Sequence, residues 1–271
     1  MAIRIAHEAP ISIFSKVEEY TDYSYALVHL FEENEEYLNL FVDALAKGRE
    51  VILDNSIFEL EEAFDADKFA SWVEELEPTW YIVPDSLENI DKTIRNMEDW
   101  NNAYGAFPNS KKIGVVQGKT YSEIVECYEY MANVAQVDMI AISFDYSYFE
   151  KAFPNSNKYI SWMLGRVNLL NRMMRDGVID KELPHHLLGC VLPQEFSFYN
   201  FPEYSYIYSL DTSNPVVHGI KNITYQPQGL WNKESQKLFE LINYNPSSEQ
   251  IGNIIYNIRK FRSLTNGAQY F

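Results

Sequence analysis

The feature that most constrains the fold is an alternation between short apolar runs and longer stretches with helical periodicity. The N-terminal run is Ile3–Ala6. Seven more are Tyr25–Leu30, Val51–Leu53, Trp80–Val83, Ile113–Val116, Met139–Ile142, Leu187–Val191 and Tyr206–Leu210. Helical periodicity fills most of the intervals, at Glu35–Ala46, Asp67–Leu76, Leu87–Trp100, Ser122–Val134 and Tyr159–Met174. Strands that alternate with helices indicate βα units around a parallel sheet.

About eight such units in a chain of 271 residues predict an α/β fold, a (β/α)8 barrel of the TIM type. The apolar runs lack polar alternation, as expected for strands covered on both faces. A doubly wound open sheet is the structural rival, but no Gly-rich phosphate loop follows an early strand. We expect a single domain over 1–271, with a C-terminal helical segment at about 230–265 whose last helix is Ser248–Leu264.

The formal net charge of −17 is unevenly distributed along the chain. Residues 1–100 hold 24 acidic and 7 basic residues, whereas residues 101–271 hold 15 of each. This distribution excludes a uniformly basic nucleic-acid coat, although it leaves open binding through a local patch.

The chain lacks an apolar run long enough for a membrane span, and its N-terminus lacks the pattern of a signal peptide. The two cysteines, Cys127 and Cys190, are too few for a disulfide framework or a Cys-rich zinc site. We therefore expect a cytoplasmic protein that contacts no membrane and carries no zinc or other cofactor.

Polar side chains follow most of the predicted strands. They are Asp54, Asp85, Gln117, Ser143, Asp145, Gln194, Glu195 and Asp211. A single Asp after a strand is typical of a helix N-cap, but three that directly follow apolar strands, together with a Gln, favour a functional site. Such a ring of carboxylates can bind Mg²⁺, carry out glycosyl transfer, or hydrogen-bond a purine.

The histidines and Cys190 distinguish these chemistries only slightly. His29 lies in or at the end of an apolar strand and is interpreted as a core residue. His185 and His186 precede a predicted strand, so we expect them at the structural end of the barrel. His218 follows Asp211 closely enough to reach the site, and Cys190 is expected to face the core. Neither a zinc-type His pair nor an acyl-transfer serine motif occurs.

Taken in order, the strand ends resemble those of the tRNA-guanine transglycosylase superfamily, TIM barrels that exchange purine bases. The stretch ILDNSIFE, with Asp54 and Phe58, is similar to the family's DSGGFQ strand end. Asp85 in YIVPD resembles its second base-binding Asp, and GVVQG at 114–118 is the most specific match, to GIVQG. Residues 141–143, 187–189 and 211–215 resemble later family strand ends, so the likeness covers roughly residues 50–215.

The chain also departs from the tRNA enzymes. It has no cysteine after Cys190, so their C-terminal zinc module is absent, and it is shorter than they are. The family's Gly pairs are replaced by Asn55-Ser56 and Ser143-Phe144. On these grounds the chain looks most similar to the compact, often phage-encoded DpdA-type branch, which inserts 7-deazaguanine bases into DNA.

The resemblance implies a base exchange through a covalent intermediate. Asp211 would be the nucleophile at C1′, and Asp54 the general acid and base. The residues that would bind the base are Asp85, Gln117, Gly118, Ser143 and Phe58. The implied partners are guanine-containing DNA and a free 7-deazaguanine such as preQ0, and the implied outcome is modified phage DNA protected from host restriction.

Basic residues outside the acidic N-terminal part supply candidate nucleic-acid contacts. They are Lys119, Arg166, Arg172, Arg259, Lys260 and Arg262. A homo-oligomer, or a partner subunit that carries the DNA-binding surface, would also reconcile an acidic chain with DNA. Two other classes stay open: a metal-assisted TIM-barrel hydrolase, and a non-catalytic acidic barrel that binds a partner protein.

Overall fold

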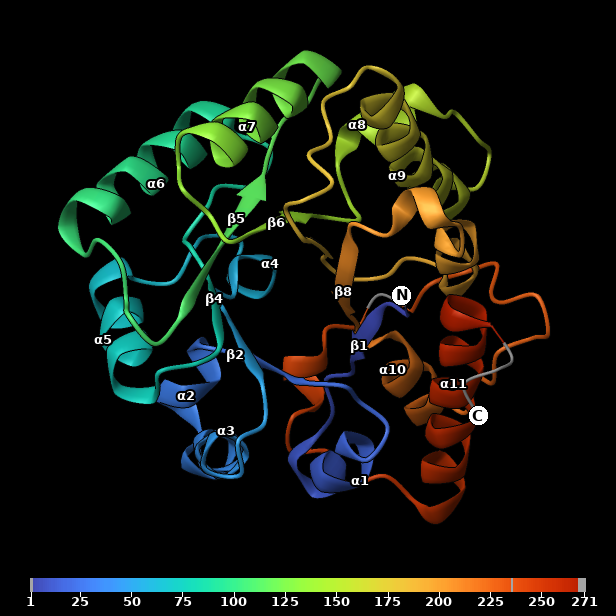
Figure 1. The fold of residues 1–271 in the computed structure, drawn as a ribbon. Helices are drawn as coiled ribbons and strands as arrows, with labels where there is room; N and C mark the ends of the chain where they lie inside the picture. The colour runs from blue at the N-terminus through green and yellow to red at the C-terminus, as the bar shows by residue number, and fades with distance from the viewer. Residues whose placement is uncertain (1, 235, 268–271) are drawn as a thin grey trace.

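The computed structural model describes residues 2–234 and 236–267, which form a (β/α)8 barrel of the TIM type (Figure 1). All eight strands are parallel, and their order in the sheet is β1-β8-β7-β6-β5-β4-β3-β2. The strands are β1 (Arg4–Ala6), β2 (Ser24–Leu27), β3 (Val51–Asp54), β4 (Trp80–Ile82), β5 (Lys111–Val116), β6 (Met139–Ile142), β7 (His185–Leu187) and β8 (Ile207–Asp211). The predicted fold class is confirmed.

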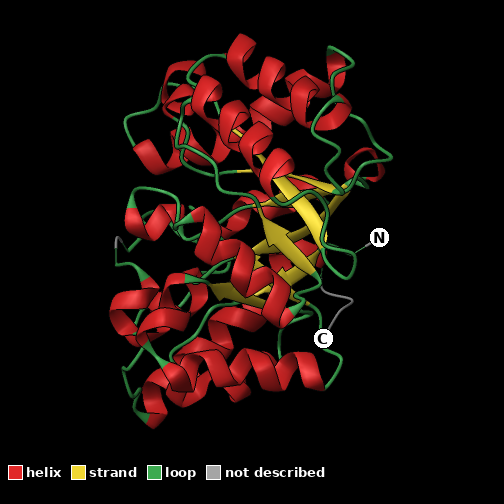
Figure 2. Cartoon of the chain, turned by 90° about the vertical axis from the view of Figure 1, so that its left-hand side faces the viewer, coloured by secondary structure: helices red, strands yellow, loops and turns green. Residues whose placement is uncertain are grey.

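Helices pack around the outside of the barrel of strands (Figure 2). The α-helices are α1 (Phe14–Glu18), α2 (His29–Glu33), α3 (Glu35–Ala46), α4 (Ile57–Leu60), α5 (Ala66–Leu76), α6 (Ile90–Ala103), α7 (Tyr121–Asn133), α8 (Ser147–Ala152), α9 (Lys158–Arg175), α10 (Asn214–Ile220) and α11 (Ser248–Asn266). Short 3-10 helices are η1 (Ile11–Ile13), η2 (Pro193–Tyr199), η3 (Pro202–Tyr204) and η4 (Leu238–Leu241). No described helix has both the length and the apolar character needed to cross a membrane.

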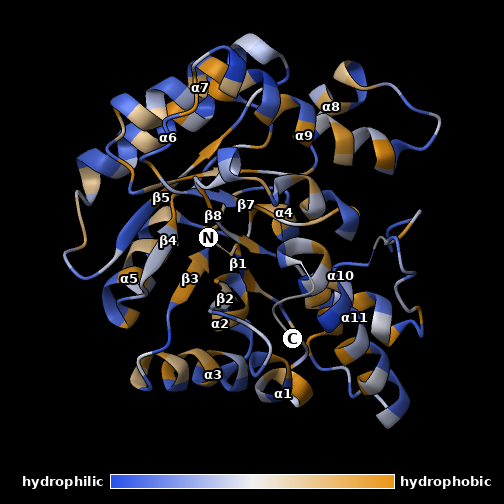
Figure 3. Ribbon diagram, turned by 45° about the vertical axis from the view of Figure 1, so that its right-hand side comes forward, coloured by the Kyte–Doolittle hydropathy of each residue, from blue (hydrophilic) through white to orange (hydrophobic). Residues whose placement is uncertain are grey.

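The strands form because their residues are apolar on both faces, one towards the barrel interior and the other towards the helices. All four residues of β3 and of β6 are buried. Strand β3 is accordingly among the most hydrophobic segments of the molecule, whereas the outer helices carry both polar and apolar residues (Figure 3). Side-chain caps define where the longer helices begin, as at Asn34, Thr120 and Ser247, because each accepts a hydrogen bond from the first turn.

The barrel is nearly closed rather than continuously hydrogen-bonded. The sheet begins at β1 and ends at β2, and these two edges are joined just before β2. There the Asp22 N–H donates to Ile5 O at 2.8 Å, and the Asp22 carboxylate accepts from the Ile5 N–H at 2.8 Å. A side chain thus replaces part of the missing strand pairing.

Residues after β8 add a layer outside the barrel. Helix α11 packs against α10, where Val216 and Ile254 belong to a second buried apolar cluster that also includes Ile13. The predicted helical segment at about 230–265 is only partly correct, because the long helix begins at Ser248. The earlier part contains the short η4 and otherwise irregular chain, part of which lies over the carboxyl end of the barrel.

Two predicted strands are displaced in the structure. The strand predicted at Tyr25–Leu30 ends at Leu27, and His29 is the first residue of α2. The strand predicted at Leu187–Val191 is instead His185–Leu187. Both errors have one cause: an apolar run by itself does not separate a buried strand from the buried turn beside it.

Candidate functional site

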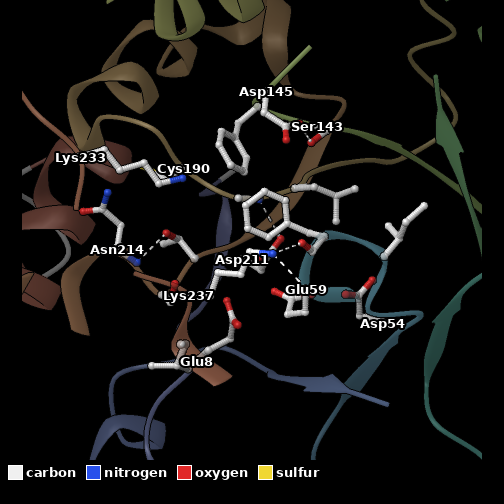
Figure 4. Close-up of a pocket in the computed structure, with 18 of the residues that line it drawn as sticks. Glu8, Asp54, Glu59, Ser143, Asp145, Cys190, Asp211, Asn214, Lys233 and Lys237 are labelled. Atoms are coloured by element: carbon white, nitrogen blue, oxygen red, sulfur yellow. Dashed lines mark hydrogen bonds between the residues drawn. The ribbon is translucent and has the colours of Figure 1, made fainter. Parts of the chain in front are cut away.

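A cavity of about 260 Å³ opens at the carboxyl ends of the strands. Every strand end contributes to its wall, as is typical of functional sites in TIM barrels. The contributing residues are Glu8 after β1, Leu27 of β2, Asp54 of β3, Asp85 after β4, Gln117 after β5, Ser143 after β6, Gly189 after β7 and Asp211 of β8. Figure 4 shows Glu8, Asp54, Ser143 and Asp211 around one space.

Two hydrogen-bond donors hold the carboxylate of Asp211 in place. Its Oδ1 accepts a hydrogen bond from His186 Nε2 at 3.0 Å and another from the Gly189 N–H at 3.1 Å. Gly189 has a left-handed φ of 62°, and a Cβ there would lie 2.5 Å from the Phe144 ring, so no other residue fits without displacement. Both of these bonds use Oδ1, which leaves Oδ2 for a ligand in the cavity.

His186 lies inside the barrel and is fully buried. Its Nδ1 is 2.8 Å from Ser209 Oγ, and its ring stacks on Tyr25 with a centroid distance of 6.0 Å. Because a carboxylate oxygen only accepts, Nε2 carries a proton, and in the neutral ring the Ser209 hydroxyl then donates to Nδ1. The expectation that His186 lies at the structural end of the barrel is wrong, since β7 begins before the apolar run and aims this ring at Asp211.

Several further carboxyl groups, among them those of Glu8, Asp54 and Glu59, share the cavity with Asp211. Burial raises the pKa of Asp54 well above its usual range, and the charges of Glu59 and Asp211 add to this effect. Burial and the charge of Asp211 likewise raise the pKa of Glu8 strongly and that of Glu59 to about 7. Like charges in a confined site favour protonation, so this group offers both acid and base forms near neutral pH.

Asp85 and Gln117 form a hydrogen-bonded pair on the β4–β5 side of the cavity. Gln117 Nε2 donates to one Asp85 oxygen at 2.7 Å, and Asn55 Nδ2 donates to the other at 2.9 Å. The Glu88 N–H donates to Gln117 Oε1 at 2.8 Å, so both ends of the amide are oriented. Burial raises the pKa of Asp85. The pair presents a rigid polar edge to the cavity.

Of the other predicted base-binding residues, Phe58 and Ser143 line the cavity and Gly118 does not. Phe58 is 38% exposed and packs edge-on against Phe144 at 5.5 Å. Ser143 Oγ donates to Asp145 at 2.7 Å. Gly118 instead permits close packing of α7, since a Cβ there would lie 2.8 Å from the Ile124 backbone nitrogen.

The structure contradicts the proposed nucleic-acid contact of Arg166. This side chain is fully buried and forms an ion pair with Glu195 at 2.6 Å. It also donates to the backbone oxygens of Leu188 at 2.8 Å and Gly189 at 3.0 Å. Arg166 therefore links α9 to the chain after β7. Helical periodicity alone did not indicate this role, because its partner Glu195 lies outside any periodic segment.

The remaining predicted contacts lie on different parts of the surface. Lys119 is exposed at the start of α7, and the Arg172 guanidinium lies 3.5 Å from the centre of the Tyr121 ring. Arg262 pairs with Asp22 at 3.1 Å, and Arg259 reaches Tyr20, so these two lie near the amino ends of the strands, away from the cavity. Lys260, between them on α11, is partly exposed.

Several cavity residues were missed from the sequence. Glu8 follows β1 as closely as Asp85 follows β4, so the rule of examining strand ends could have found it. Glu59 lies on α4, while Lys233 and Lys237 come from irregular chain after α10, where no sequence pattern indicates a site. His218, expected to reach the site, does line the cavity, with Nδ1 2.8 Å from Asn214 O.

Cys190 also lines the cavity, and burial raises the pKa of its thiol. Among residues 2–234 and 236–267, no group of three or more His, Cys, Asp or Glu side chains is placed to hold a metal ion. The sequence matches no protein-family model and no curated protein.

Proposed function

We propose that the protein is a glycosyltransferase of the base-exchange type, which replaces guanine in DNA with a free 7-deazaguanine such as preQ0. One observation carries this proposal. Asp211 is oriented by His186 and Gly189 with one oxygen left for a ligand, in the same cavity as Asp54, whose pKa is raised. A fixed carboxylate beside a protonatable one is the pair of groups that glycosyl transfer requires.

The exchange takes place in two displacements at C1′ of the nucleoside. Asp211 Oδ2 attacks C1′ as the bond from C1′ to the guanine nitrogen breaks, and Asp54 gives its proton to the departing base. The product is a glycosyl ester on Asp211 and a carboxylate on Asp54. Asp54 then removes a proton from the incoming 7-deazaguanine, whose nitrogen attacks C1′ and releases Asp211. Atoms and charge return to their starting state, so no redox partner is needed.

The polar pair Asp85 and Gln117 binds the edge of the base in this proposal, with Ser143 on the neighbouring strand end. The rings of Phe58 and Phe144 at the rim provide apolar faces for stacking. A base inside a duplex cannot reach a cavity at the end of a barrel, so the nucleotide must be flipped out or single-stranded. This requirement fits the position of the site at the bottom of an opening rather than on a flat surface.

The biological setting follows from the same proposal. Exchange in DNA would take place in the host cytoplasm and would protect phage DNA from restriction. The acidic N-terminal part of the chain disfavours close approach of long DNA there, which is consistent with a partner subunit or a homo-oligomer that supplies more positive surface.

The direct test is the substitution Asp211→Ala, measured by incorporation of labelled guanine or preQ0 into DNA. We expect the exchange rate to fall by about three orders of magnitude or more, because the nucleophile is lost. A denaturation-resistant enzyme–DNA adduct, visible on a denaturing gel for the wild type, should disappear.

The matched control is Asp43→Asn, which removes a negative charge from the exposed face of α3 and should leave exchange unchanged. Exchange by Asp211→Ala at close to the wild-type rate would refute the nucleophile assignment. The metal-assisted hydrolase makes a different prediction: a chelator would abolish turnover, and no exchanged base would appear in the DNA.

A further inference from the structure

The cavity contains lysines as well as carboxylates. Lys158, Lys233 and Lys237 all line it. Lys237 is already engaged, because its Nζ donates to the backbone oxygens of Phe58 at 2.9 Å and Glu59 at 3.0 Å. Lys158 and Lys233, like Lys237, lie over aromatic rings, but neither of them is paired with a carboxylate in the described part of the chain. These two ammonium groups are the cavity's candidates for holding an anion.

The surroundings of Lys233 give the stronger argument for an anion site. Its Nζ lies 3.7 Å from the centre of the Phe144 ring and 5.9 Å from that of Phe58. Among residues 2–234 and 236–267, no carboxylate lies within ion-pair distance of it, although several share its cavity. Burial lowers the pKa of Lys233 to about 8. A partly buried ammonium that has no direct ion-pair partner is unfavourable, and a bound anion would reduce that cost.

The two lysines belong to one side of the cavity rim. Asn157, the cap of α9 next to Lys158, donates through Nδ2 to Trp231 O at 2.7 Å, so the start of α9 is tied to the segment that carries Lys233. Lys158 lies 5.3 Å from the centre of the Trp162 ring, and Trp162 packs on Phe144 at 6.3 Å. The two lysines and the two aromatic rings between them, those of Trp162 and Phe144, therefore form one continuous part of the cavity rim that is both cationic and aromatic.

Two of the cavity's carboxyl groups lie away from Lys233. Figure 4 shows Lys233 on one side of Asp211, with Asp54 and Glu59 on the other. Other cavity carboxylates, such as that of Asp145, are near enough for their charge to favour the protonated form of Lys233, but none in the described chain is paired with it directly. The cavity therefore has an acidic region at the strand ends and a cationic rim beside it. A ligand with a neutral polar base, a sugar and a phosphate matches that order of groups. A free nucleoside would leave the cationic rim unused.

We propose that Lys233, together with Lys158, binds a phosphate group of the nucleotide whose sugar lies at Asp211. This inference rests on the proposed function, and it assigns the residues that hold a phosphate next to the reacting sugar. The phosphate belongs either to a polynucleotide backbone or to a free nucleotide, and the rim aromatics suit stacking in both cases. Because the rim is positively charged, nucleic acid would approach the protein at the mouth of the cavity.

The test compares three probes with the purified protein: 2′-deoxyguanosine, its 5′-monophosphate, and a short single-stranded oligonucleotide with one guanine. We expect the wild type to bind the monophosphate at least about tenfold more tightly than the nucleoside at low salt. In Lys233→Met that preference should be lost, while nucleoside affinity changes less than about twofold. The charge-conserving Lys233→Arg should retain most of the preference, and Lys181→Met, on the exposed chain before β7, serves as the matched control.

The outcomes separate the two proposals. If the wild type binds nucleoside and monophosphate equally, or if Lys233→Met keeps the full preference, the phosphate site is wrong even when base exchange is observed. If the preference depends on Lys233 but no exchange is found with any probe, the phosphate site stands and the proposed function falls. Stronger binding of the oligonucleotide than of the monophosphate identifies the polymer backbone as the source, and equal binding identifies a free nucleotide. Thermal unfolding of each variant establishes that the protein is folded.

Discussion

At the scale of single residues, the orientation of Asp211 depends on a histidine that sequence position did not single out. His186 uses both ring nitrogens, one for Ser209 and one for Asp211, and is stacked on Tyr25. The ring cannot rotate without losing two hydrogen bonds, and because it is fully buried, water cannot replace them. His186 is thus a positioning residue, which fixes the direction in which Asp211 presents its second oxygen.

The substitution His186→Asn tests this role. The shorter side chain cannot satisfy both Ser209 and Asp211, so Asp211 gains freedom to turn. We expect kcat for base exchange to fall about 100-fold while KM changes little, because misplacement of a reacting group acts mainly on the chemical step. The free energy of unfolding should decrease by about 1–3 kcal/mol through the unsatisfied buried groups.

Ser209→Ala serves as the graded control, because it removes only the outer hydrogen bond of the ring. It should lower kcat less than His186→Asn does. An unchanged kcat in His186→Asn would show that Gly189 alone orients Asp211. A rise in KM with kcat unchanged would instead assign His186 to substrate binding.

The residues that could be predicted share one property, which is direct attachment to a strand end. Asp54, Asp85, Gln117, Ser143 and Asp211 each follow an apolar run, and the structure brings all five to one cavity. Residues whose role depends on a distant partner could not be predicted. The partner of Arg166 is Glu195, in a 3-10 helix with no periodic signal, and Lys233 comes from irregular chain.

At the scale of elements, helix α9 does more than cover the barrel. The Arg166 guanidinium grips Glu195 through two bonds, at 2.6 and 3.1 Å, and Tyr199 donates to the same carboxylate at 2.8 Å. It also holds the backbone of Leu188 and Gly189. Since Gly189 donates to Asp211, α9 supports the site through the loop after β7. The periodicity of α9 predicted the helix itself but not this attachment.

Removal of one partner of this buried pair should be costly. In Arg166→Met the Glu195 carboxylate is left without a countercharge, so we expect the free energy of unfolding to fall by about 3–5 kcal/mol in urea denaturation. Arg175→Met, at the exposed end of the same helix, should change it by less than about 0.5 kcal/mol. The double variant Arg166→Met, Glu195→Gln should recover part of the loss, and equal losses in the single and double variants would contradict the assignment.

At the scale of the whole molecule, the cluster of carboxyl groups links stability to pH. The pKa of Glu59 is raised to about 7 in the folded protein, whereas its usual value is 4.5. At a pH between those two values, Glu59 keeps its proton in the folded state and releases it in the unfolded chain. Stability therefore decreases as pH rises through this interval, by at most about 1.4 kcal/mol per pH unit for one such group.

The substitution Glu59→Gln isolates this contribution. It should flatten the decrease in the free energy of unfolding between about pH 5 and about pH 7, measured by urea denaturation of both proteins at several pH values. Part of the flattening will come from Asp54, whose pKa is raised by the charge of Glu59. A variant with the same pH slope as the wild type would show that Glu59 is ionised in the folded protein throughout this range.

The seam between β1 and β2 has a consequence for how the two ends of the chain are held together. The strands on either side of this line are buried, so the polar groups that they leave without a full ladder must be satisfied from within the molecule. Asp22 occupies that line, since its carboxylate accepts from the Ile5 N–H and also pairs with Arg262 of α11. One carboxylate thus joins the first strand of the barrel to the last helix of the chain, at the only line between described strands where the sheet itself supplies no ladder.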